Sequence, residues 1–340
     1  MQDFEDMKQA VLRGEVLDST AAETAFAHLL SGTIDTIDIA AFLTALKVRG
    51  ETPAEILGAV RVLRRGVDAD LAPHGAMDTC GTGGDGLNTL NVSTTVALVL
   101  AAGGVPIAKH GNRSVSSKSG SSDVLAALGV AVKQPKQAIA EALRTLNIGF
   151  LFAPSFHAAM ATVGPVRAQL KTRTIFNLLG PLANPAGVKR QLVGTYDARW
   201  CQPMAEVLRD LHAEKAWVVH GTDGLDEISI SGPTIVTELS TGALDTFEIT
   251  PEDAGLKAHP LSAIAGGDAQ HNAAAMRAVL SGEQGAYFDA VALNAAAGFL
   301  IAGKAASLAE GAALAAEILS SGAALRLLGS WAAFTKQHAA

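Results

Sequence analysis

Cysteine, aromatic residues and long hydrophobic runs are all scarce in this sequence. Only 2 of the 340 residues are cysteine, and Cys80 and Cys201 have neither the spacing of a metal site nor the density of a secreted disulfide scaffold. The longest mostly apolar stretch, residues 96–108, contains two glycines and a proline and is shorter than the ~20 residues of a bilayer span. The first residues are acidic and helix-like, unlike a secretion signal. We therefore expect a cytoplasmic protein with no membrane partner.

An excess of positive charge is also missing. Lys and Arg total 26 against 33 for Asp and Glu, which gives a formal net charge of −7. Such a chain has no overall electrostatic attraction to nucleic acid or to anionic membranes, so we expect no nucleic-acid partner. Any anionic ligand must be held by a local site.

Aromatic residues make up only 5% of the chain, a composition that favours helices packed on a parallel sheet over an all-β sandwich. Residues 1–70 have apolar side chains at helical spacing and predict a small N-terminal helical domain. From residue 71 to residue 340, short strands alternate with helices, which predicts a large α/β domain with a mostly parallel central sheet flanked by helices. A helical insertion at 160–185 is expected to pack back on the first domain. The strands are predicted at residues 76–79, 105–109, 149–152, 191–195, 216–220 and 235–239.

A glycine-rich loop, DTCGTGGDGLNTLNVST at residues 78–94, follows the first predicted strand. Its G-x-G-x-x-G resembles a dinucleotide-binding turn, but that turn needs an acidic residue ~20 positions later, where this chain has Lys109. Glycines also let backbone N–H groups crowd around an anion, while Ser93 and Thr94 are placed to cap the next helix and direct its positive end at a phosphate. We interpret the loop as a diphosphate cradle.

Two more polar loops follow later strands. Residues 109–123, with three cations and six serines, predict a second anion-binding loop in which Ser121 or Ser122 caps the following helix. Asp226 and Glu227 follow the strand at 216–220, and adjacent carboxylates beside phosphate loops indicate a Mg²⁺ site. Each feature alone is more often a solvated surface loop. Ligands collect at the carboxyl ends of strands in open α/β sheets, so we expect the three loops to form one site.

These motifs resemble those of the anthranilate phosphoribosyltransferase family, and the resemblance covers nearly the whole chain. It rests on several long motifs in one order: GTGGDG-x-x-T-x-N-x-S-T at 81–94, KHGNR-x-x-S-S-x-x-G-S at 109–121, FAP-x-x-H at 152–157, VGPVR at 163–167, RTIFNLLGPL-x-NP at 173–185 and GLDEIS at 224–229.

The resemblance implies a homodimer formed through the helical domains, with the active site in the cleft between the two domains. It also implies Mg²⁺-dependent transfer of a phosphoribosyl group from 5-phosphoribosyl 1-diphosphate to anthranilate. The residues expected to bind the donor are Gly81, Gly83, Gly84, Asp85, Thr89, Asn91, Ser93, Thr94, Lys109 and Ser121. Ser93, Asp226 and Glu227 are expected to bind the metal, and His110, Asn112, His157 and Arg167 to line the anthranilate path. Lys109, His110, Asn112 and Arg167 form the expected catalytic set.

The chemistry of this transfer explains why no catalytic triad is needed. Departure of diphosphate leaves an oxocarbenium-like ribose, so the main requirement is to stabilise the leaving negative charge with N–H groups, Lys109 and Mg²⁺. Arg167 can pair with the anthranilate carboxylate. Whether His110 or His157 transfers protons stays open at this point.

Two alternatives share the expected fold. A pyrimidine nucleoside phosphorylase-like enzyme would use inorganic phosphate, and the metal pair Asp226–Glu227 together with the long loop at 109–123 favours a diphosphate donor instead. A non-catalytic nucleic-acid-binding relative is disfavoured by the net charge of −7 and by the presence of both metal carboxylates.

Overall fold

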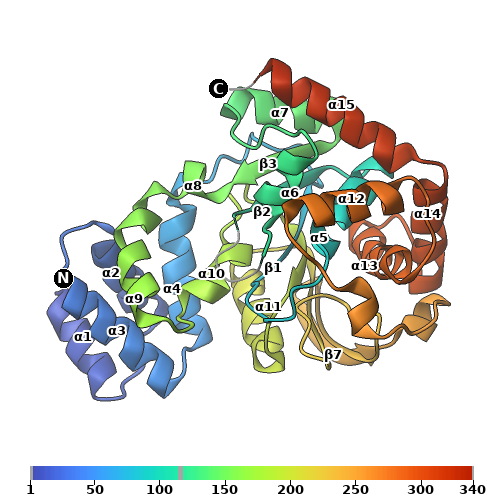
Figure 1. The fold of residues 1–340 in the computed structure, drawn as a ribbon. Coiled ribbons are helices and arrows are strands. Elements are labelled where there is room, and N and C mark those ends of the chain that lie inside the picture. The colour runs from blue at the N-terminus through green and yellow to red at the C-terminus, as the bar shows by residue number, and fades with distance from the viewer. Residues whose placement is uncertain (1–2, 114–117, 339–340) are drawn as a thin grey trace.

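The computed structural model describes residues 3–113 and 118–338. The chain begins with four helices, which stand beside the rest of the molecule (Figure 1). Aspartate or threonine caps each of them, and Thr52 and Glu55 form a reciprocal capping box on either side of Pro53. The helices are α1 (Phe4–Leu12), α2 (Ser19–Leu30), α3 (Thr36–Arg49) and α4 (Pro53–Leu63).

The expected helical insertion packs against these four helices. Its helices α9 (Gly164–Leu170) and α10 (Phe176–Leu182) contact α3 and α4 respectively. Phe176 meets Phe26 edge to face, with ring centres 5.8 Å apart. The insertion and the N-terminal helices therefore share one apolar core, although more than 100 residues separate them in the chain.

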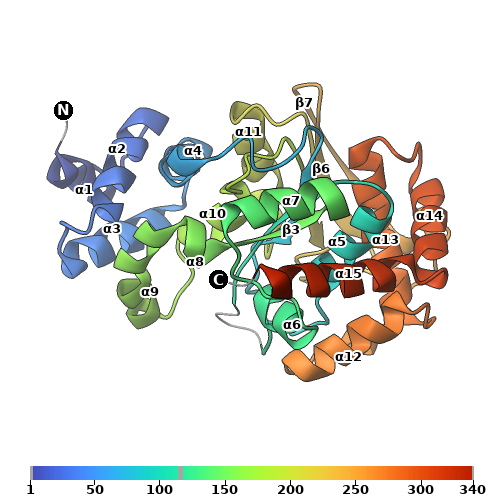
Figure 2. The same ribbon diagram turned by 90° about the horizontal axis from the view of Figure 1, so that it is seen from above.

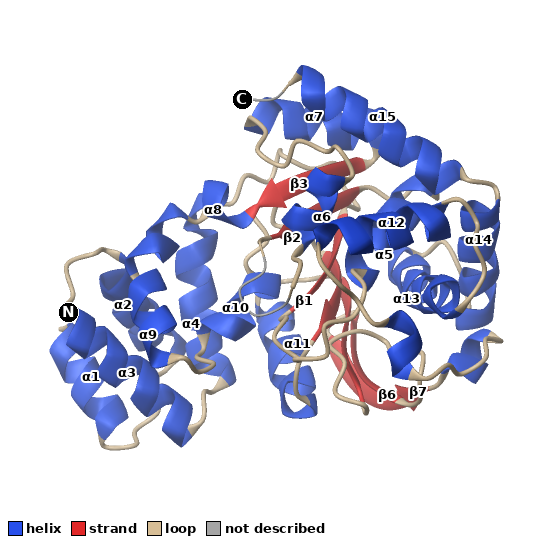
Figure 3. Cartoon of the chain, viewed as in Figure 1, coloured by secondary structure: helices blue, strands red, loops and turns tan. Residues whose placement is uncertain are grey.

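A seven-stranded sheet forms the centre of the larger part, in the order β3-β2-β1-β4-β5-β6-β7 (Figure 3). The first five strands are parallel, and β6 and β7 extend the sheet as an antiparallel hairpin. The strands are β1 (Met77–Gly81), β2 (Ile107–Gly111), β3 (Ile148–Phe152), β4 (Arg190–Gly194), β5 (Lys215–Gly221), β6 (Thr234–Ser240) and β7 (Ala243–Ile249). The α/β fold class and the mostly parallel sheet are thus confirmed.

All six predicted strands are present, but β7 is absent from the sequence-based prediction. This edge strand is largely exposed, so it lacks the apolar run that marks the buried strands. The signal that identifies it is the turn at Thr241 and Gly242, both with positive φ, which suits a two-residue hairpin.

Helices cover both faces of the sheet (Figure 2). Successive residues of one strand enter different cores. Leu192 of β4 packs with α5 (Val92–Ala102) and α13 (Ala286–Ala302), whereas Val193 packs with α11 (Cys201–Asp210) and the N-terminal helices. The remaining helices are α6 (Ser121–Ala127), α7 (Lys136–Leu146), α8 (Ala153–Phe156), α12 (Ala269–Leu280), α14 (Leu308–Ser320) and α15 (Ala323–Gln337). Within the described ranges, no single helix is long and apolar enough to cross a membrane.

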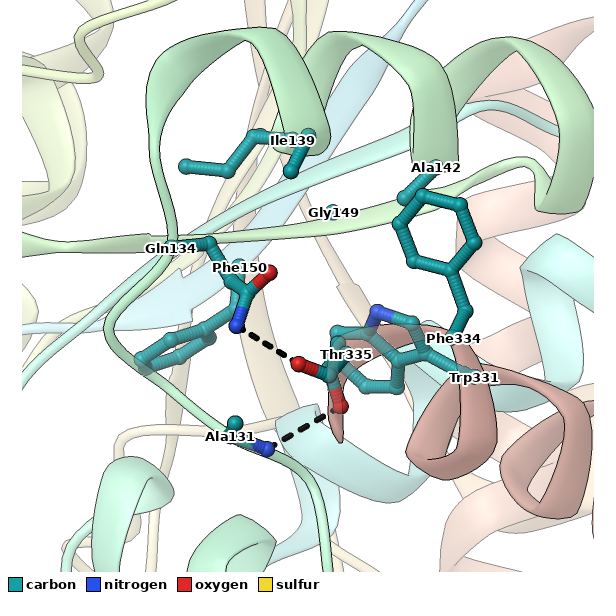
Figure 4. Close-up of a pocket in the computed structure, with 10 residues that line it drawn as sticks. Ala131, Gln134, Ile139, Ala142, Gly149, Phe150, Trp331, Phe334 and Thr335 are labelled. Atoms are coloured by element: carbon teal, nitrogen blue, oxygen red, sulfur yellow. Dashed lines mark hydrogen bonds between the residues drawn. The ribbon is translucent and has the colours of Figure 1, made fainter. Parts of the chain in front are cut away.

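The last helix, α15, is fastened to the rest of the domain beside β3 and α7. Thr335 accepts a hydrogen bond from the Ala131 amide at 3.0 Å, and its carbonyl accepts one from the Gln134 side chain at 2.9 Å (Figure 4). A cavity of about 10 Å³ lies between α15 and the segment around these two residues, lined by Phe150 and Trp331 among others. Such a volume holds one water molecule at most, so it belongs to the packing of α15.

Candidate active site

The order of the strands places the predicted loops together. From β1 the chain builds β2 and β3 on one side and then returns to form β4 on the other side of β1. The loops after β1 and β4 therefore lead away in opposite directions at the carboxyl edge, which is where open α/β sheets bind ligands. The glycine-rich loop follows β1 at this point.

Gly83, Gly84 and Gly86 have φ values of 65°, 76° and 82°, a backbone conformation that strongly favours glycine. The loop leads into α5, whose N-cap is Asn91 rather than the predicted Ser93. The Asn91 side chain does not cap the helix, because its amide reaches the Ser119 carbonyl and its oxygen accepts from Asn272 at 2.9 Å.

The acidic turn after β5 is bonded to this loop at two places. Asp226 Oδ2 accepts a hydrogen bond from the Gly83 amide at 2.6 Å, and Glu227 Oε1 accepts one from the Ser93 amide at 3.0 Å. Asp223 shapes the turn from inside, since it accepts bonds from the Leu225 amide and the Ser229 hydroxyl. The two carboxylates predicted to bind metal thus face the predicted diphosphate cradle.

Two glycines permit this approach. A Cβ at Gly81 would lie 2.4 Å from Asp226 Oδ2, and a Cβ at Gly194 would lie 1.6 Å from the Asp226 carbonyl oxygen. Gly194, at the end of β4, was missed by the sequence-based prediction. The signal available in the sequence is its position as a glycine ending a strand next to the switch point of the sheet.

The acidic groups at the loops repel one another. Burial raises the pKa of Asp226 well above its usual range, and the charges of Asp85 and Glu227 raise it further. Burial likewise raises the pKa of Glu227, to about 7, while Lys109 opposes the shift. Among the described residues, no group of three His, Cys, Asp or Glu side chains is arranged to hold a metal ion by itself. A cation here would need further oxygen ligands, as Mg²⁺ takes from a diphosphate.

Lys109, at the end of β2, lies beneath the loops and is only 2% exposed. Its Nζ donates to the Thr79 carbonyl at 2.5 Å, and its charge acts on Asp78 and Glu227. Asp78 is fully buried and accepts from the His110 amide at 3.1 Å and from Asn184 at 2.8 Å. Asp78 and Asn184 hold β1, β2 and the insertion together, and the sequence-based prediction missed both.

The second predicted loop is described only at its two ends, because Ser114, Val115, Ser116 and Ser117 lie outside the described residues. The Asn112 carbonyl accepts from the Ser121 hydroxyl at 3.2 Å, which closes the loop. Ser121 is the first residue of α6, and Gly120 is the N-cap, so the predicted capping by Ser121 or Ser122 is wrong. The side chain of Asp123 accepts a hydrogen bond from the Gly120 amide at 2.9 Å.

Two other predicted residues of the first loop have packing partners. Thr89 pairs with Ala265 in an isolated antiparallel bridge, and Thr94 is buried in the first turn of α5. The bridge at Thr89 thus fixes the start of the segment that leads into α5.

His110 and His157 meet edge to face, with ring centres 5.2 Å apart. Nδ1 of His110 lies 3.0 Å from the Gly180 carbonyl oxygen, which assigns the proton to Nδ1 and leaves Nε2 as an acceptor. Burial lowers the pKa of His110 to about 3, and it also lowers the pKa of His157. Both rings are therefore neutral at pH 7, and neither Nε2 atom has a hydrogen-bond partner among the described residues.

Arg167 lies in the last turn of α9, within the helical insertion. Its guanidinium carbon is 5.4 Å from the centre of the Phe176 ring, and burial lowers its pKa. It forms no ion pair within residues 3–113 and 118–338, and no hydrogen bond there joins it to the other predicted site residues. A half-buried guanidinium without a counter-ion is suited to an anionic group of a ligand.

Comparisons with known proteins cover both parts of the chain. Residues 6–66 match the family model described as glycosyl transferase family, helical bundle domain, and residues 74–325 match the glycosyl transferase family, a/b domain. The anthranilate phosphoribosyltransferase of Rhodopseudomonas palustris (strain HaA2) is 52% identical over 324 residues, which cover 95% of this chain and 96% of the relative. That of Parvibaculum lavamentivorans is 50% identical over 335 residues, 98% of each chain.

Two solved structures are also similar. The anthranilate phosphoribosyltransferase of Thermus thermophilus has a TM-score of 0.91 and 46% identity, and the match covers 97% of this chain and 99% of that one. The enzyme of Saccharomyces cerevisiae in complex with PRPP and Mg has a TM-score of 0.90 and 29% identity, with 98% of each chain covered.

The neutral, buried state of His110 predicts a specific pH dependence of stability. An unfolded histidine takes up a proton below about pH 6.5, whereas folded His110 stays neutral down to about pH 3. The unfolded state thus binds more protons in this window, and stability is lost as the pH falls, by about 1.4 kcal/mol per pH unit for one full proton. The variant His110→Gln should lose less stability than the parent between about pH 7 and about pH 5. Urea unfolding at both pH values measures this, and equal losses would show that His110 is protonated in the folded protein.

Proposed function

The chain belongs to the anthranilate phosphoribosyltransferase family of glycosyl transferases, and we propose that it transfers the 5-phosphoribosyl group of 5-phosphoribosyl 1-diphosphate to the amine of anthranilate. The products are N-(5-phosphoribosyl)anthranilate and diphosphate, and the reaction serves tryptophan biosynthesis. The observation that carries the proposal is the contact of Asp226 and Glu227 with the amides of Gly83 and Ser93, because it joins a carboxylate pair to a loop built for an anion.

The residues present fit a magnesium ion. Asp226 and Glu227 raise each other's electrostatic energy, and Asp85 adds a third negative charge, so a cation at this place removes the repulsion. We propose that Asp226, Glu227 and Ser93 hold Mg²⁺ together with oxygens of the diphosphate. The ion would supply positive charge to the leaving diphosphate.

Groups of the chain itself also favour departure of the diphosphate, because they too place positive charge near it. The glycine-rich loop presents backbone amides, and α5 starts directly behind it with its positive end toward the loop. Lys109 supplies a fixed positive charge beneath the loop. These donors are in place before the reaction, so they stabilise developing negative charge without reorganisation.

On the acceptor side, the residues orient anthranilate rather than activate it. The aromatic amine is neutral at pH 7 and attacks without prior deprotonation. We propose that Arg167 pairs with its carboxylate and that His110 accepts a hydrogen bond at Nε2. With its pKa lowered to about 3, His110 is a weak base, so a positioning role is favoured over proton transfer.

The two alternatives are less well supported. A phosphorolytic enzyme needs no carboxylate pair against its phosphate loop, and the relatives of Rhodopseudomonas palustris and Parvibaculum lavamentivorans, 52% and 50% identical, are named as anthranilate phosphoribosyltransferases. The net charge of −7 argues against a nucleic-acid-binding role.

We further propose a homodimer in the cytoplasm. Four large apolar side chains are conspicuously exposed in the described part of the chain, and all lie in the N-terminal helical unit: Leu12, Val16, Ile37 and Val48. Ile37 and Val48, both in α3, are 77% and 81% exposed. Apolar side chains gathered on one small unit indicate a surface that a second copy covers.

The direct test of function mixes the purified protein with anthranilate, 5-phosphoribosyl 1-diphosphate and Mg²⁺ and follows the fluorescence of anthranilate. The double variant Asp226→Asn, Glu227→Gln should remain folded, and its melting temperature without Mg²⁺ should equal or exceed that of the parent because the repulsion is gone. Its turnover should fall at least 100-fold at limiting Mg²⁺, roughly the effect of losing one strong electrostatic contact to the leaving charge. Asp245→Asn with Glu248→Gln, on the exposed edge strand β7, is the matched control. Unchanged turnover in the first variant would refute the metal assignment.

The role of Arg167 predicts a graded loss of anthranilate recognition. Arg167→Lys keeps the charge but loses the planar fork, and Arg167→Ala loses both, so the KM for anthranilate should rise in that order. For the alanine variant the rise should correspond to a loss of about 1.5–3 kcal/mol of binding free energy. The KM for the donor should stay nearly constant. Aniline, which lacks the carboxylate, provides the control substrate. If Arg167→Ala still prefers anthranilate over aniline as the parent does, the carboxylate is recognised elsewhere.

The dimer proposal is tested by placing charge on α3. Ile37→Glu with Val48→Glu should convert a dimer into a monomer at micromolar concentration, because a charge is costly to bury in an apolar interface. Analytical ultracentrifugation measures the change. Ala309→Glu, at an exposed position of α14, adds charge far from the helical unit and should leave the dimer intact. A parent protein that sediments as a monomer would rule the proposal out.

A further inference from the structure

A side chain from the helical insertion contacts the glycine-rich loop directly. The Arg173 guanidinium donates a hydrogen bond to the Gly84 carbonyl oxygen. Its central carbon also lies 4.1 Å from the centre of the Tyr196 ring. Arg173 is largely exposed and forms no ion pair with any residue in the ranges that the structure describes, so a carbonyl and a ring are its partners in place of a carboxylate.

Tyr196 is itself tied to the same loop. It follows β4, and its amide donates to the Thr82 hydroxyl at 3.1 Å. The Thr82 amide in turn donates to the Gly194 carbonyl at 2.9 Å. The loop after β4 therefore supports the glycine-rich loop from one side, and Arg173 reaches both of them from the insertion.

The insertion also carries the proposed acceptor residue. Arg167 lies in the last turn of α9, which ends at Leu170, and Lys171 then reverses the chain with a φ of 48°. Three residues later the Thr174 amide donates to Asn177 at 3.0 Å and fixes the start of α10. Only a short connection, bonded at its end through Thr174, separates Arg167 from Arg173, so the chain links their positions.

We propose that Arg173 is a positioning residue that couples the donor site to the acceptor site. The proposal rests on the proposed function, because it takes the glycine-rich loop as the donor site and Arg167 as the acceptor contact. Arg173 holds the insertion against the glycine-rich loop. An anion bound at the loop strengthens this contact and thereby raises the affinity of the acceptor site for anthranilate.

The physical link is a single peptide unit. The Gly84 carbonyl and the Asp85 amide belong to the same peptide group, so an anion that accepts a hydrogen bond from the Asp85 amide polarises the Gly84 carbonyl. A polarised carbonyl is a better acceptor for the guanidinium, since hydrogen bonds in a chain strengthen one another. By thermodynamic linkage, anthranilate must then strengthen binding at the loop by the same factor.

The experiment measures anthranilate binding to the full-length protein by fluorescence, with and without Mg²⁺ and inorganic diphosphate. Diphosphate carries no ribose, so no transfer occurs during the titration. In the parent protein, saturating Mg²⁺ and diphosphate should lower the Kd for anthranilate about fivefold or more, within the usual range of coupling between sites. In Arg173→Ala this ratio should fall close to one, while the Kd for anthranilate alone changes less than twofold.

Other variants separate coupling from a general structural effect. Arg173→Lys keeps the charge without the planar stack and should give an intermediate ratio, and Tyr196→Phe keeps the ring and should give the parent ratio. Arg199→Ala is the matched control, because Arg199 stacks on Trp200 at 4.9 Å and pairs with Asp197. It should leave the ratio unchanged.

The outcomes distinguish this proposal from the proposed function. If the parent protein transfers the phosphoribosyl group but Arg173→Ala keeps the full ratio, or if the parent ratio is one, the coupling role is refuted and the function stands. If the parent protein neither binds anthranilate nor transfers to it, both are refuted. A drop in the ratio that Arg199→Ala reproduces would also overturn the specific role of Arg173.

Discussion

The candidate active site depends on the close approach of the acidic turn after β5 to the ends of β1 and β4. This approach exists because Gly81 and Gly194 carry no side chains, and a Cβ at either position would collide with Asp226. Once the turn lies there, its carboxylates reach the amides of the glycine-rich loop and fix the position of that loop. The loop after β4 and the insertion then pack against the same segment, through Tyr196 and Arg173.

The electrostatic arrangement follows from that contact. Carboxylates are held where they repel one another, and Lys109 is held beneath them, where its charge opposes the rise that burial causes in the pKa of Asp78 and of Glu227. Like charges are thus held close together at fixed positions, as expected for a place that receives a cation and a polyanion together. The neighbouring histidines are neutral, and the half-buried Arg167 forms no ion pair with the residues described. The two halves of the proposed site therefore differ in charge, which suits a polyphosphate donor and a small aromatic acid as acceptor.

Binding of both substrates must be coordinated, because attack requires the amine and the ribose carbon to be aligned. The fold offers a connection for this purpose in the insertion. It shares its core with the N-terminal helices, through Phe26 and Phe176, and it also contacts the glycine-rich loop through Arg173. A segment anchored at both ends is a suitable carrier of coupling, since its two contacts cannot change independently.

Much of this protein could be predicted from the sequence itself. Alternating strands and helices determined the α/β sheet, and six of its strands were located because each contains a short run of buried apolar residues bounded by turn residues. The glycines, serines and carboxylates at strand ends indicated the place where we propose a phosphate site. The sequence did not indicate the exposed strand β7, whose side chains face solvent and carry no apolar signal. Nor did it identify Asn91 as the N-cap of α5, because the Asn91 side chain bonds to Asn272, which lies 181 residues away in the chain.

Only the tertiary structure decided which distant residues act together. Asp78 and Asn184 are 106 residues apart, and Arg173 and Gly84 are 89 residues apart, so no local pattern marks either pair. The pKa of His110 was also beyond the sequence, because it is lowered mainly by burial and by His157, which is distant in the chain, while the adjacent Lys109 makes a smaller contribution. Local sequence determines backbone conformation and the direction of side chains, whereas charge, burial and contact depend on what the rest of the chain brings to the same place.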